Sequence, residues 1–264
     1  MSDNTTIIAF LGKGGVGKTA LSAITGKIFM EASKRVLFID ADPAEGLATA
    51  LGISGYKTIG VAREEIIGHA RIASGDQEKE RLAEIIDYCL LESLHEEPAF
   101  SAIVMGQTNR LGCYCPINSL LRNAIGSIAE QFDVVIVDAE AGIEQVNRQV
   151  VERVNYPVIV SDNSLRSVRS VKLILDTIER SPSMNPVKTG VVFNRVDKFD
   201  MELAAEIAQC GIGIYGTVPP DLLISDFDRL GEPITSLPAD SAAVQSMKLI
   251  IKGLQIMSPD KEIN

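Results

Sequence analysis

The segment that decides the fold is residues 12–19, which read Gly12-Lys13-Gly14-Gly15-Val16-Gly17-Lys18-Thr19. It matches the pattern G-x-x-x-x-G-K-[ST] at every fixed position. An apolar run precedes it at residues 7–11, and apolar residues recur after it at helical spacing, at Leu21, Ile24 and Ile28. A buried strand, a glycine-rich turn and an amphipathic helix in this order predict a loop whose backbone N–H groups bind phosphate.

The lysines and the hydroxyl of this loop have expected roles. Lys18 should reach the β- and γ-phosphates of a nucleotide, and Thr19 should ligate Mg²⁺. Lys13 is a second lysine that points either toward the nucleotide of a second subunit, where it would stabilise developing phosphoryl charge, or into solvent. A glycine-rich turn without a ligand is the alternative for the whole segment.

Six further short apolar runs follow along the chain, at residues 36–39, 102–105, 134–137, 157–160, 189–193 and 214–218. Helical patterns lie between them. Near-continuous apolar strands that alternate with helices predict an α/β fold: a doubly wound, mostly parallel sheet with helices on both faces. We expect one domain over residues 1–257 and a polar tail over 258–264. Residues 61–100, rich in Glu, Lys and Arg, are expected to form surface helices and loops.

The composition narrows the classes of partner. Hydrophobic residues make up 46% of the 264 residues, which is enough for a large core. The net charge of −10 disfavours nucleic acid as a partner, because proteins that bind polyanions usually carry basic surfaces. Apolar runs fall short of the ~18–20 residues of a membrane span. We therefore expect a cytoplasmic protein with neither nucleic acid nor membrane as a partner.

Three carboxylates follow predicted strands. Asp40 and Asp42 come after residues 36–39, and Asp138 comes after residues 134–137. Ligands of open α/β sheets bind where strands end, so Asp40 and Asp138 are expected to support Mg²⁺ and Asp42 to orient the attacking water. An acidic turn and an exposed strand-end carboxylate are the alternatives. Asn194 also ends a strand and could contact a purine edge or simply form a turn.

The cysteine pair in Cys113-Tyr114-Cys115 is a candidate metal site, separate from the phosphate loop. In an extended segment the two sulfurs lie on one side and make half of a four-coordinate site for a soft metal ion. A symmetric dimer would supply four sulfurs, which suits Zn²⁺ or Ni²⁺. Two coincidental thiols are the alternative. Cys89 and Cys210 lie in apolar helical patterns and are expected to be structural.

The phosphate loop resembles the deviant Walker A motif of the MinD/ParA/nitrogenase-iron-protein group of dimerising ATPases. The resemblance implies that Lys13 acts in trans across a nucleotide sandwich dimer. It also implies that residues 40–43 and 138–142 are the two switch segments, and that Asn194 and Pro219 flank the adenine. One departure is Ala20, a nucleotide-binding position where many members have a threonine that faces the α-phosphate.

The loop and the cysteine pair together resemble the CooC-type nickel-insertion ATPases that serve carbon monoxide dehydrogenase and acetyl-CoA synthase. This resemblance implies ATP and Mg²⁺ as ligands, Ni²⁺ or Zn²⁺ at Cys113 and Cys115, a nucleotide-dependent homodimer and a nickel-enzyme client. Hydrolysis would reopen the dimer and release the metal. The rivals are an Fe–S electron-transfer ATPase, in which the cysteines should lie far apart in sequence, and a partition or division ATPase, in which a basic face or helix is expected.

Overall fold

The computed structural model describes residues 5–70, 76–107, 115–139, 153–180, 186–198, 200–254 and 256. Within them the strands form one sheet in the order β3-β4-β2-β5-β1-β6-β7-β8. All neighbours run parallel except β3, which is antiparallel to β4. The strands are β1 (Thr6–Leu11), β2 (Val36–Asp40), β3 (Leu94–Glu96), β4 (Ser101–Val104), β5 (Val134–Asp138), β6 (Tyr156–Ser161), β7 (Gly190–Asn194) and β8 (Gly213–Val218).

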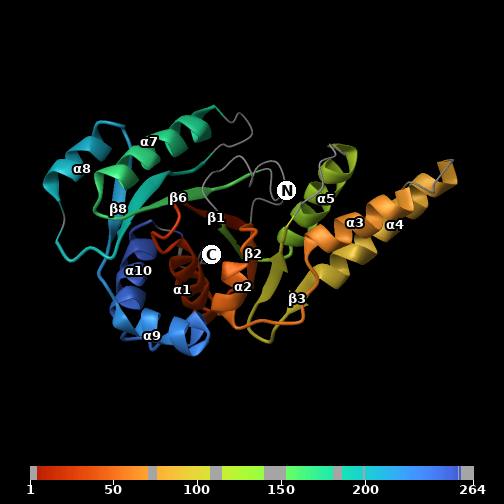
Figure 1. Cartoon of the computed structure of the whole chain (residues 1–264), viewed down its shortest axis with the longest axis horizontal. Coiled ribbons are helices and arrows are strands. Elements are labelled where there is room, and N and C mark those ends of the chain that lie inside the picture. Colours follow the sequence, from red (N-terminus) through yellow and green to blue (C-terminus); the bar gives the residue numbers. More distant parts are fainter. Residues whose placement is uncertain are drawn as a thin grey trace, which may run out of the picture.

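The helices cover both faces of this sheet (Figure 1). They are α1 (Lys18–Glu31), α2 (Gly46–Leu51), α3 (Ile59–Ala70), α4 (Asp76–Ser93), α5 (Cys115–Ala129), α7 (Leu165–Glu179), α8 (Met201–Ala208), α9 (Leu222–Leu230) and α10 (Ala242–Gly253), with a short 3₁₀ helix, η1 (Ile234–Ser236). Alternation along β1 shows how the layers arise. Ile7 and Ala9 belong to the core shared with α3, α4, α5, α7 and α8, whereas Ile8 and Phe10 belong to the core shared with α1, α2 and α10. The predicted doubly wound α/β fold is confirmed.

The helix α1 packs very closely on the sheet because one of its residues has no side chain. A Cβ at Gly26 would overlap the ring of Phe38 on β2. Phe38 in turn meets Phe100 edge to face, with 5.3 Å between ring centroids. The close approach fixes the helix that carries Lys18 and Thr19, the last two residues of the phosphate loop.

The sequence prediction was wrong for one short strand. Residues 94–96, expected within surface helices and loops, form the edge strand β3. The segment Leu-His-Glu has no apolar run, and it becomes a strand by pairing antiparallel with the next strand, β4, across a short connection. The helices α3 and α4 agree with the expectation for the rest of that region.

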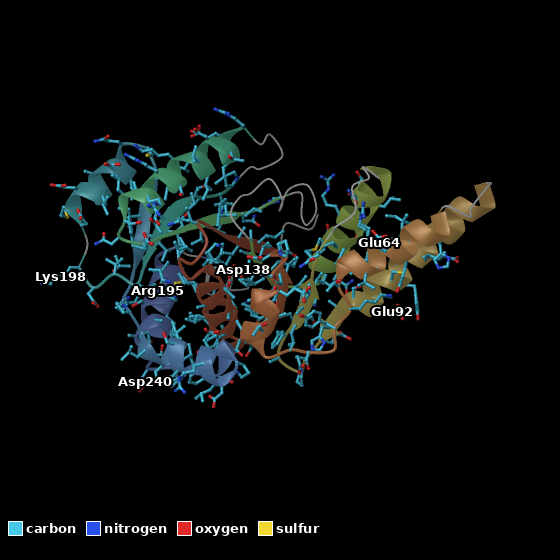
Figure 2. All side chains as sticks on the ribbon, in the orientation of Figure 1. Glu64, Glu92, Asp138, Arg195, Lys198 and Asp240 are labelled. Atoms are coloured by element: carbon cyan, nitrogen blue, oxygen red, sulfur yellow. The ribbon has the colours of Figure 1, made fainter. Side chains whose placement is uncertain are left out.

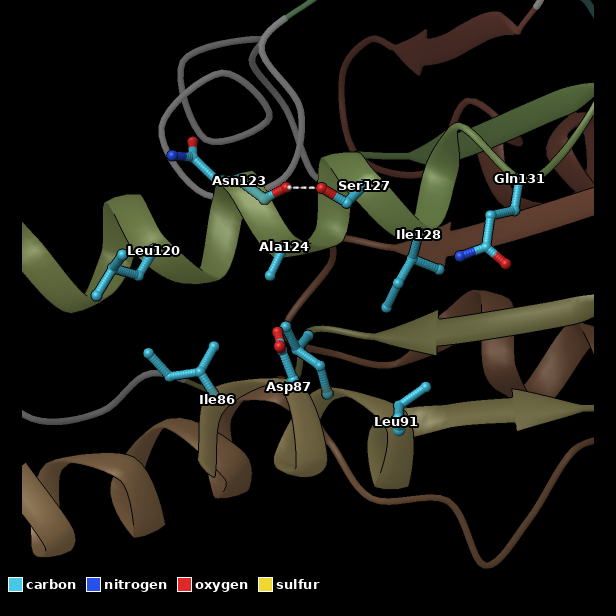
Figure 3. A pocket seen from close by; sticks show the side chains of 10 residues that line it. Ile86, Asp87, Leu91, Leu120, Asn123, Ala124, Ser127, Ile128 and Gln131 are labelled. Atoms are coloured by element: carbon cyan, nitrogen blue, oxygen red, sulfur yellow. Dashed lines mark hydrogen bonds between the residues drawn. The ribbon is translucent and has the colours of Figure 1, made fainter. Parts of the chain in front are cut away.

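The helices α3, α4 and α5 lie together at one end of the molecule (Figure 1). Lys57 binds Glu65 of α3 at 2.5 Å and Glu92 of α4 at 2.8 Å, so one ammonium joins both helices. A groove of about 490 Å³ lies between α4 and α5, and none of the predicted nucleotide-binding residues lines it. Figure 3 shows the side chains of the two helices that face each other across it. Its walls are mainly apolar side chains, with Asp87 as the charged group among them.

Candidate active site

The carboxyl ends of β1, β2 and β5 lie side by side, and this places the predicted residues at one edge of the sheet. Asp138 is the register partner of both Phe10 on β1 and Asp40 on β2. The phosphate loop therefore begins beside Asp138, and Asp40 lies on the next strand. Residues about 100 apart in sequence meet because parallel strands share their polarity.

The loop between β1 and α1 needs glycine at two positions. Gly12 has φ 144°, and a Cβ there would overlap the carbonyl oxygen of Val160 on β6. Gly17 has φ 91°, and a Cβ there would overlap the side-chain amide of Asn194. Both positions combine a left-handed backbone with a close neighbour, so any other residue is strained. The loop is thereby held tightly between β6 and the end of β7.

Asp138 is the buried carboxylate of the site. Its Oδ2 accepts a hydrogen bond from Thr19 Oγ1 at 2.7 Å, and its Oδ1 accepts one from Ser22 Oγ at 3.3 Å. Burial raises the pKa of Asp138 to about 7, the hydrogen bond from Thr19 opposes this rise, and the charge of Asp40 adds to it. Figure 2 shows Asp138 at the centre of the molecule, close to α1.

Asp40 holds the turn that follows β2. Its Oδ1 accepts from the backbone N–H of Asp42 at 3.1 Å, and its Oδ2 accepts from that of Ala48 at 3.0 Å. Burial raises the pKa of Asp40 to about 6, and these backbone hydrogen bonds oppose the rise. Asp42 is half-buried, and its Oδ1 accepts from the backbone N–H of Ala44 at 2.9 Å. The expected role of Asp42 in orienting water stays a prediction.

The two lysines of the loop differ in burial. Lys18 is 7% exposed, and its Nζ donates to the carbonyl oxygen of Lys13 at 3.4 Å, so its ammonium reaches back across the loop. The side chain of Lys13 is half-exposed. Burial would raise the pKa of Asp162, but hydrogen bonds from Ser164 and Ser167, with the charge of Lys13, keep that pKa below its ordinary value.

Asn194 lies against the phosphate loop. Its Nδ2 donates to the carbonyl oxygen of Val16 at 2.8 Å, and the residue is 4% exposed. Pro219 directly follows Val218, which is the register partner of Asn194 on β8, so the two predicted base-flanking residues lie at the same edge. The adenine contact stays a prediction for both. Ala20, in the first turn of α1, is half-buried.

Two residues that the sequence analysis did not single out complete the site. Ser22 holds the second oxygen of Asp138, and it lies one turn after Thr19 on the same helix face. Arg195 donates from Nη1 to the carbonyl oxygen of Gly15 at 3.2 Å. The position of Ser22 three residues after Thr19 is a usable signal in the sequence, whereas the contact of Arg195 joins residues that are 180 apart in sequence.

The donor set suits Mg²⁺. Thr19, Asp40 and Asp138 offer a hydroxyl and two carboxylates at one sheet edge, and hard divalent cations prefer oxygen ligands. Mg²⁺ in proteins usually takes only a few ligands from side chains and retains water molecules or substrate phosphates as the others, so a site with few protein oxygens suits it. Both carboxylates are buried with raised pKa values, so a cation would stabilise their charged forms.

The predicted metal-binding cysteines fall outside the described side chains. Cys113 is not among the described residues, and Cys115 is the first residue of α5, where only the backbone is described. Elsewhere in the described ranges, no group of three or more His, Cys, Asp or Glu is arranged to hold a metal ion. Of the other two cysteines, Cys89 is buried as expected, and Cys210 is half-buried and donates to the carbonyl oxygen of Glu206 at 3.2 Å. The predicted switch residues 140–142 also lie outside the described ranges.

Residues 5–186 match the AAA domain family designated AAA_31. The chain is a P-loop ATPase of this family. An uncharacterised ATP-binding protein of Methanocaldococcus jannaschii is 30% identical to the ATPase over 248 residues, which are 92% of this chain and 96% of that protein. The carbon monoxide dehydrogenase accessory protein CooC of Rhodospirillum rubrum is 28% identical over 249 residues, which are 85% of this chain and 87% of CooC.

Solved structures show the same fold as the ATPase. A ParA family ATPase from Chlorobium tepidum has a TM-score of 0.69 at 19% identity and covers 96% of this chain and 99% of its own. MinD from Pyrococcus horikoshii, solved with Mg-ADP, has a TM-score of 0.67 at 15% identity and covers 98% of this chain and all of its own. The fold is therefore that of the MinD/ParA group. In the described part of the ATPase, no helix has the length and apolar character needed to cross a membrane.

Proposed function

We propose that the ATPase is a metallochaperone that couples ATP hydrolysis to delivery of Ni²⁺ or Zn²⁺. Its substrate metal would bind at Cys113 and Cys115 across a homodimer, and its client would be a nickel enzyme of the carbon monoxide dehydrogenase or acetyl-CoA synthase type. The similarity to CooC supports this choice within the MinD/ParA group.

The observation that carries the proposal is the position of the cysteine pair in the topology. Cys113 and Cys115 belong to the crossover from β4 to α5. That crossover leaves the sheet beside Asp40, because Val104, the last residue of β4, is the register partner of Asp40. The segment that leads to the cysteine pair and the phosphate loop thus leave the sheet at the same edge, which favours coupling between a metal site on this segment and the nucleotide site.

The residues of the nucleotide site have the following proposed roles. Lys18 and the loop N–H groups bind phosphate, Asp42 orients the attacking water, and Lys13 reaches the nucleotide of the second subunit. Thr19, Asp40 and Asp138 would hold Mg²⁺, which supplies positive charge against the phosphates. Asn194 and Pro219 flank the base. We propose that this site occupies one domain, residues 1–257, followed by the polar tail 258–264.

Replacement of the cysteines tests the metal site. The variants Cys113→Ser and Cys115→Ser should each lose metal binding but keep ATP binding. The matched control is Cys210→Ser, whose hydroxyl can keep the hydrogen bond to Glu206. The measurement is metal content per chain of Zn²⁺- or Ni²⁺-loaded protein with ATP, together with the oligomeric state. Half an ion per chain in a dimer supports a shared site, and unchanged metal content in either cysteine variant contradicts it.

Replacement of Lys13 tests the dimer. Lys13→Ala should lose ATP hydrolysis and ATP-dependent dimerisation while ATP affinity changes little, because the lysine would act on the partner's nucleotide. The control is Lys172→Ala on the exposed surface of α7. Turnover and mass by light scattering are the measurements, and normal turnover in Lys13→Ala would show that this lysine is only a surface charge.

The same measurements separate the rival functions. A positioning ATPase of the partition or division type would dimerise with ATP but bind no metal at the cysteine pair. An Fe–S electron carrier would show visible absorption from the cluster, whereas protein loaded with Zn²⁺ is colourless. One of the two basic residues of α10, Lys248, is bound to Glu31 of α1 at 2.9 Å, which weakens the case for a basic membrane-binding helix.

A further inference from the structure

We propose that Arg195 is a positioning residue that shapes the phosphate loop from the end of β7. Together with Asn194 it holds two consecutive carbonyl groups of the loop. Asn194 Nδ2 donates to Val16 at 2.8 Å, and Arg195 Nη1 donates to Gly15 at 3.2 Å. Figure 2 shows Arg195 on the side of the molecule that carries β8 and α10.

The geometry of the peptide group turns these bonds into control of the loop donors. A trans peptide is planar, so the C=O of one residue and the N–H of the next point in opposite directions. A donor that holds the C=O of Gly15 outward therefore directs the N–H of Val16 inward. The bond to Val16 does the same for the N–H of Gly17. Arg195 and Asn194 thus preset two neighbouring N–H groups for an anionic ligand.

The backbone at Arg195 explains how two consecutive side chains reach the same loop. Along a strand, neighbouring side chains point to opposite faces. Arg195 has φ 60°, in the left-handed region that a residue with a side chain rarely adopts, and this breaks the alternation. The turn is held by the bond from the N–H of Val196 to the carbonyl oxygen of Val218 at 3.0 Å. Strain kept beside a ligand site indicates that the conformation serves the site.

The exposure of Arg195 separates this role from a role in folding. The Arg195 side chain is exposed, whereas Asn194 is buried, so loss of the guanidinium removes little core packing. Substitution should therefore change the loop and leave the fold intact. The hydrogen bond from Arg195 prepares recognition of the phosphates, not of the base.

The decisive variant is Arg195→Gly, which removes the donor and relieves the left-handed strain. Its thermal stability should be unchanged or slightly higher. Its affinity for ATP and ADP should fall about tenfold, which is the effect expected from the loss of one hydrogen bond that holds the phosphate loop. Affinity for adenosine, which lacks phosphates, should be unchanged. Arg195→Lys keeps one donor and should recover part of the affinity for ATP.

The control is Lys198→Ala, which removes a positive charge from the same loop after β7 without touching the phosphate loop, and should bind ATP normally. Two results would overturn the proposal. One is unchanged ATP affinity in Arg195→Gly. The other is an equal loss for ATP and adenosine, which would place the effect at the base or in the general fold.

Discussion

Asp138 and Asp40 are two buried carboxylates on neighbouring strands, and each is raised in pKa chiefly by burial. Without a ligand the two carboxylates destabilise the fold, because burial disfavours their charged forms. The same burial favours the binding of a divalent cation, whose positive charge stabilises the charged carboxylates. Thr19 and Ser22 hold both oxygens of Asp138 in place before any ligand arrives.

The pH dependence of stability tests the buried charge of Asp138. Its pKa of about 7 in the folded protein lies above the ordinary value of 3.8, so the native state binds more protons between these limits. Stability is then lost as the pH rises through this range. Relative to Asp138→Asn, the wild type should lose free energy of unfolding from pH 5 to 7, by up to about 1.4 kcal/mol per pH unit. Urea unfolding without nucleotide or Mg²⁺ measures the difference.

The control for this prediction is Asp133→Asn. Burial would raise the pKa of Asp133, but hydrogen bonds from Arg35 keep that pKa below its ordinary value. The contribution of Asp133 to the free energy of unfolding therefore changes with pH only in the acid range below that value. The curves of this variant and the wild type should stay parallel from pH 5 to 7. Parallel curves for Asp138→Asn would instead show that its carboxylate titrates as it does in water.

Replacement by alanine should affect stability differently at two glycines of the phosphate loop, Gly12 and Gly14. Gly12→Ala brings a Cβ onto the carbonyl oxygen of Val160 at φ 144°, and it should cost about 2 kcal/mol or more of stability. Gly14→Ala meets no atom of the described chain within 4 Å and should change stability by less than about 1 kcal/mol. Denaturant unfolding of the two variants measures the difference. Equal losses of free energy of unfolding would contradict the close contact of Gly12 with Val160 on β6.

At the scale of elements, one carboxylate caps two helices. Asp221 Oδ1 accepts from the N–H of Leu223 at the start of α9, at 3.0 Å. Its Oδ2 accepts from the N–H of Ala243 at 3.0 Å and from Ser241 Oγ at 2.6 Å, at the start of α10. The helices α9 and α10 are thus joined through their N-terminal ends, where an acidic side chain also meets the favourable end of each dipole.

Removal of this shared cap should cost more than removal of a single cap. Asp221→Ala should lose about 2–4 kcal/mol, because it frees donors of two helices, whereas Asp200→Ala, which caps α8 alone, should lose about 1 kcal/mol. Urea unfolding at pH 7 measures both. Equal losses would mean that Asp221 stabilises only one of its helices.

The elements themselves were largely predictable from sequence, and the contacts between them were not. The runs at residues 36–39, 134–137 and 157–160 are apolar because both sheet faces are covered, and they form β2, β5 and β6. Residues at their ends, such as Asp40 and Asp138, were predictable for the same reason. The strand β3 was not, because its three residues carry no apolar run, and the contact of Arg195 with Gly15 was not, because it joins residues 180 apart in sequence.

At the scale of the whole molecule, the strand order predicts where the protein opens first. The strands β1 and β5 lie in the middle of the sheet, and every residue of Val134–Asp138 is buried. The last strand, β8, is largely exposed. Amide hydrogens of Ile8 and Ile136 should exchange only through global unfolding, and those of β8 about 100-fold faster or more. Hydrogen–deuterium exchange measures this, and uniform protection would contradict it.

The position of β1 between β5 and β6 has a consequence during translation. When β5 has left the ribosome, the growing chain already contains the phosphate loop, Asp40 and Asp138, but one side of β1 still has no strand to pair with. Asn194 and Arg195 have yet to be synthesised, so the loop is not held from that side. The strand β6 then pairs with the free side of β1, and until it emerges the first strand is an exposed edge. The nascent chain acquires Asn194 and Arg195 later still, in the last third of its synthesis.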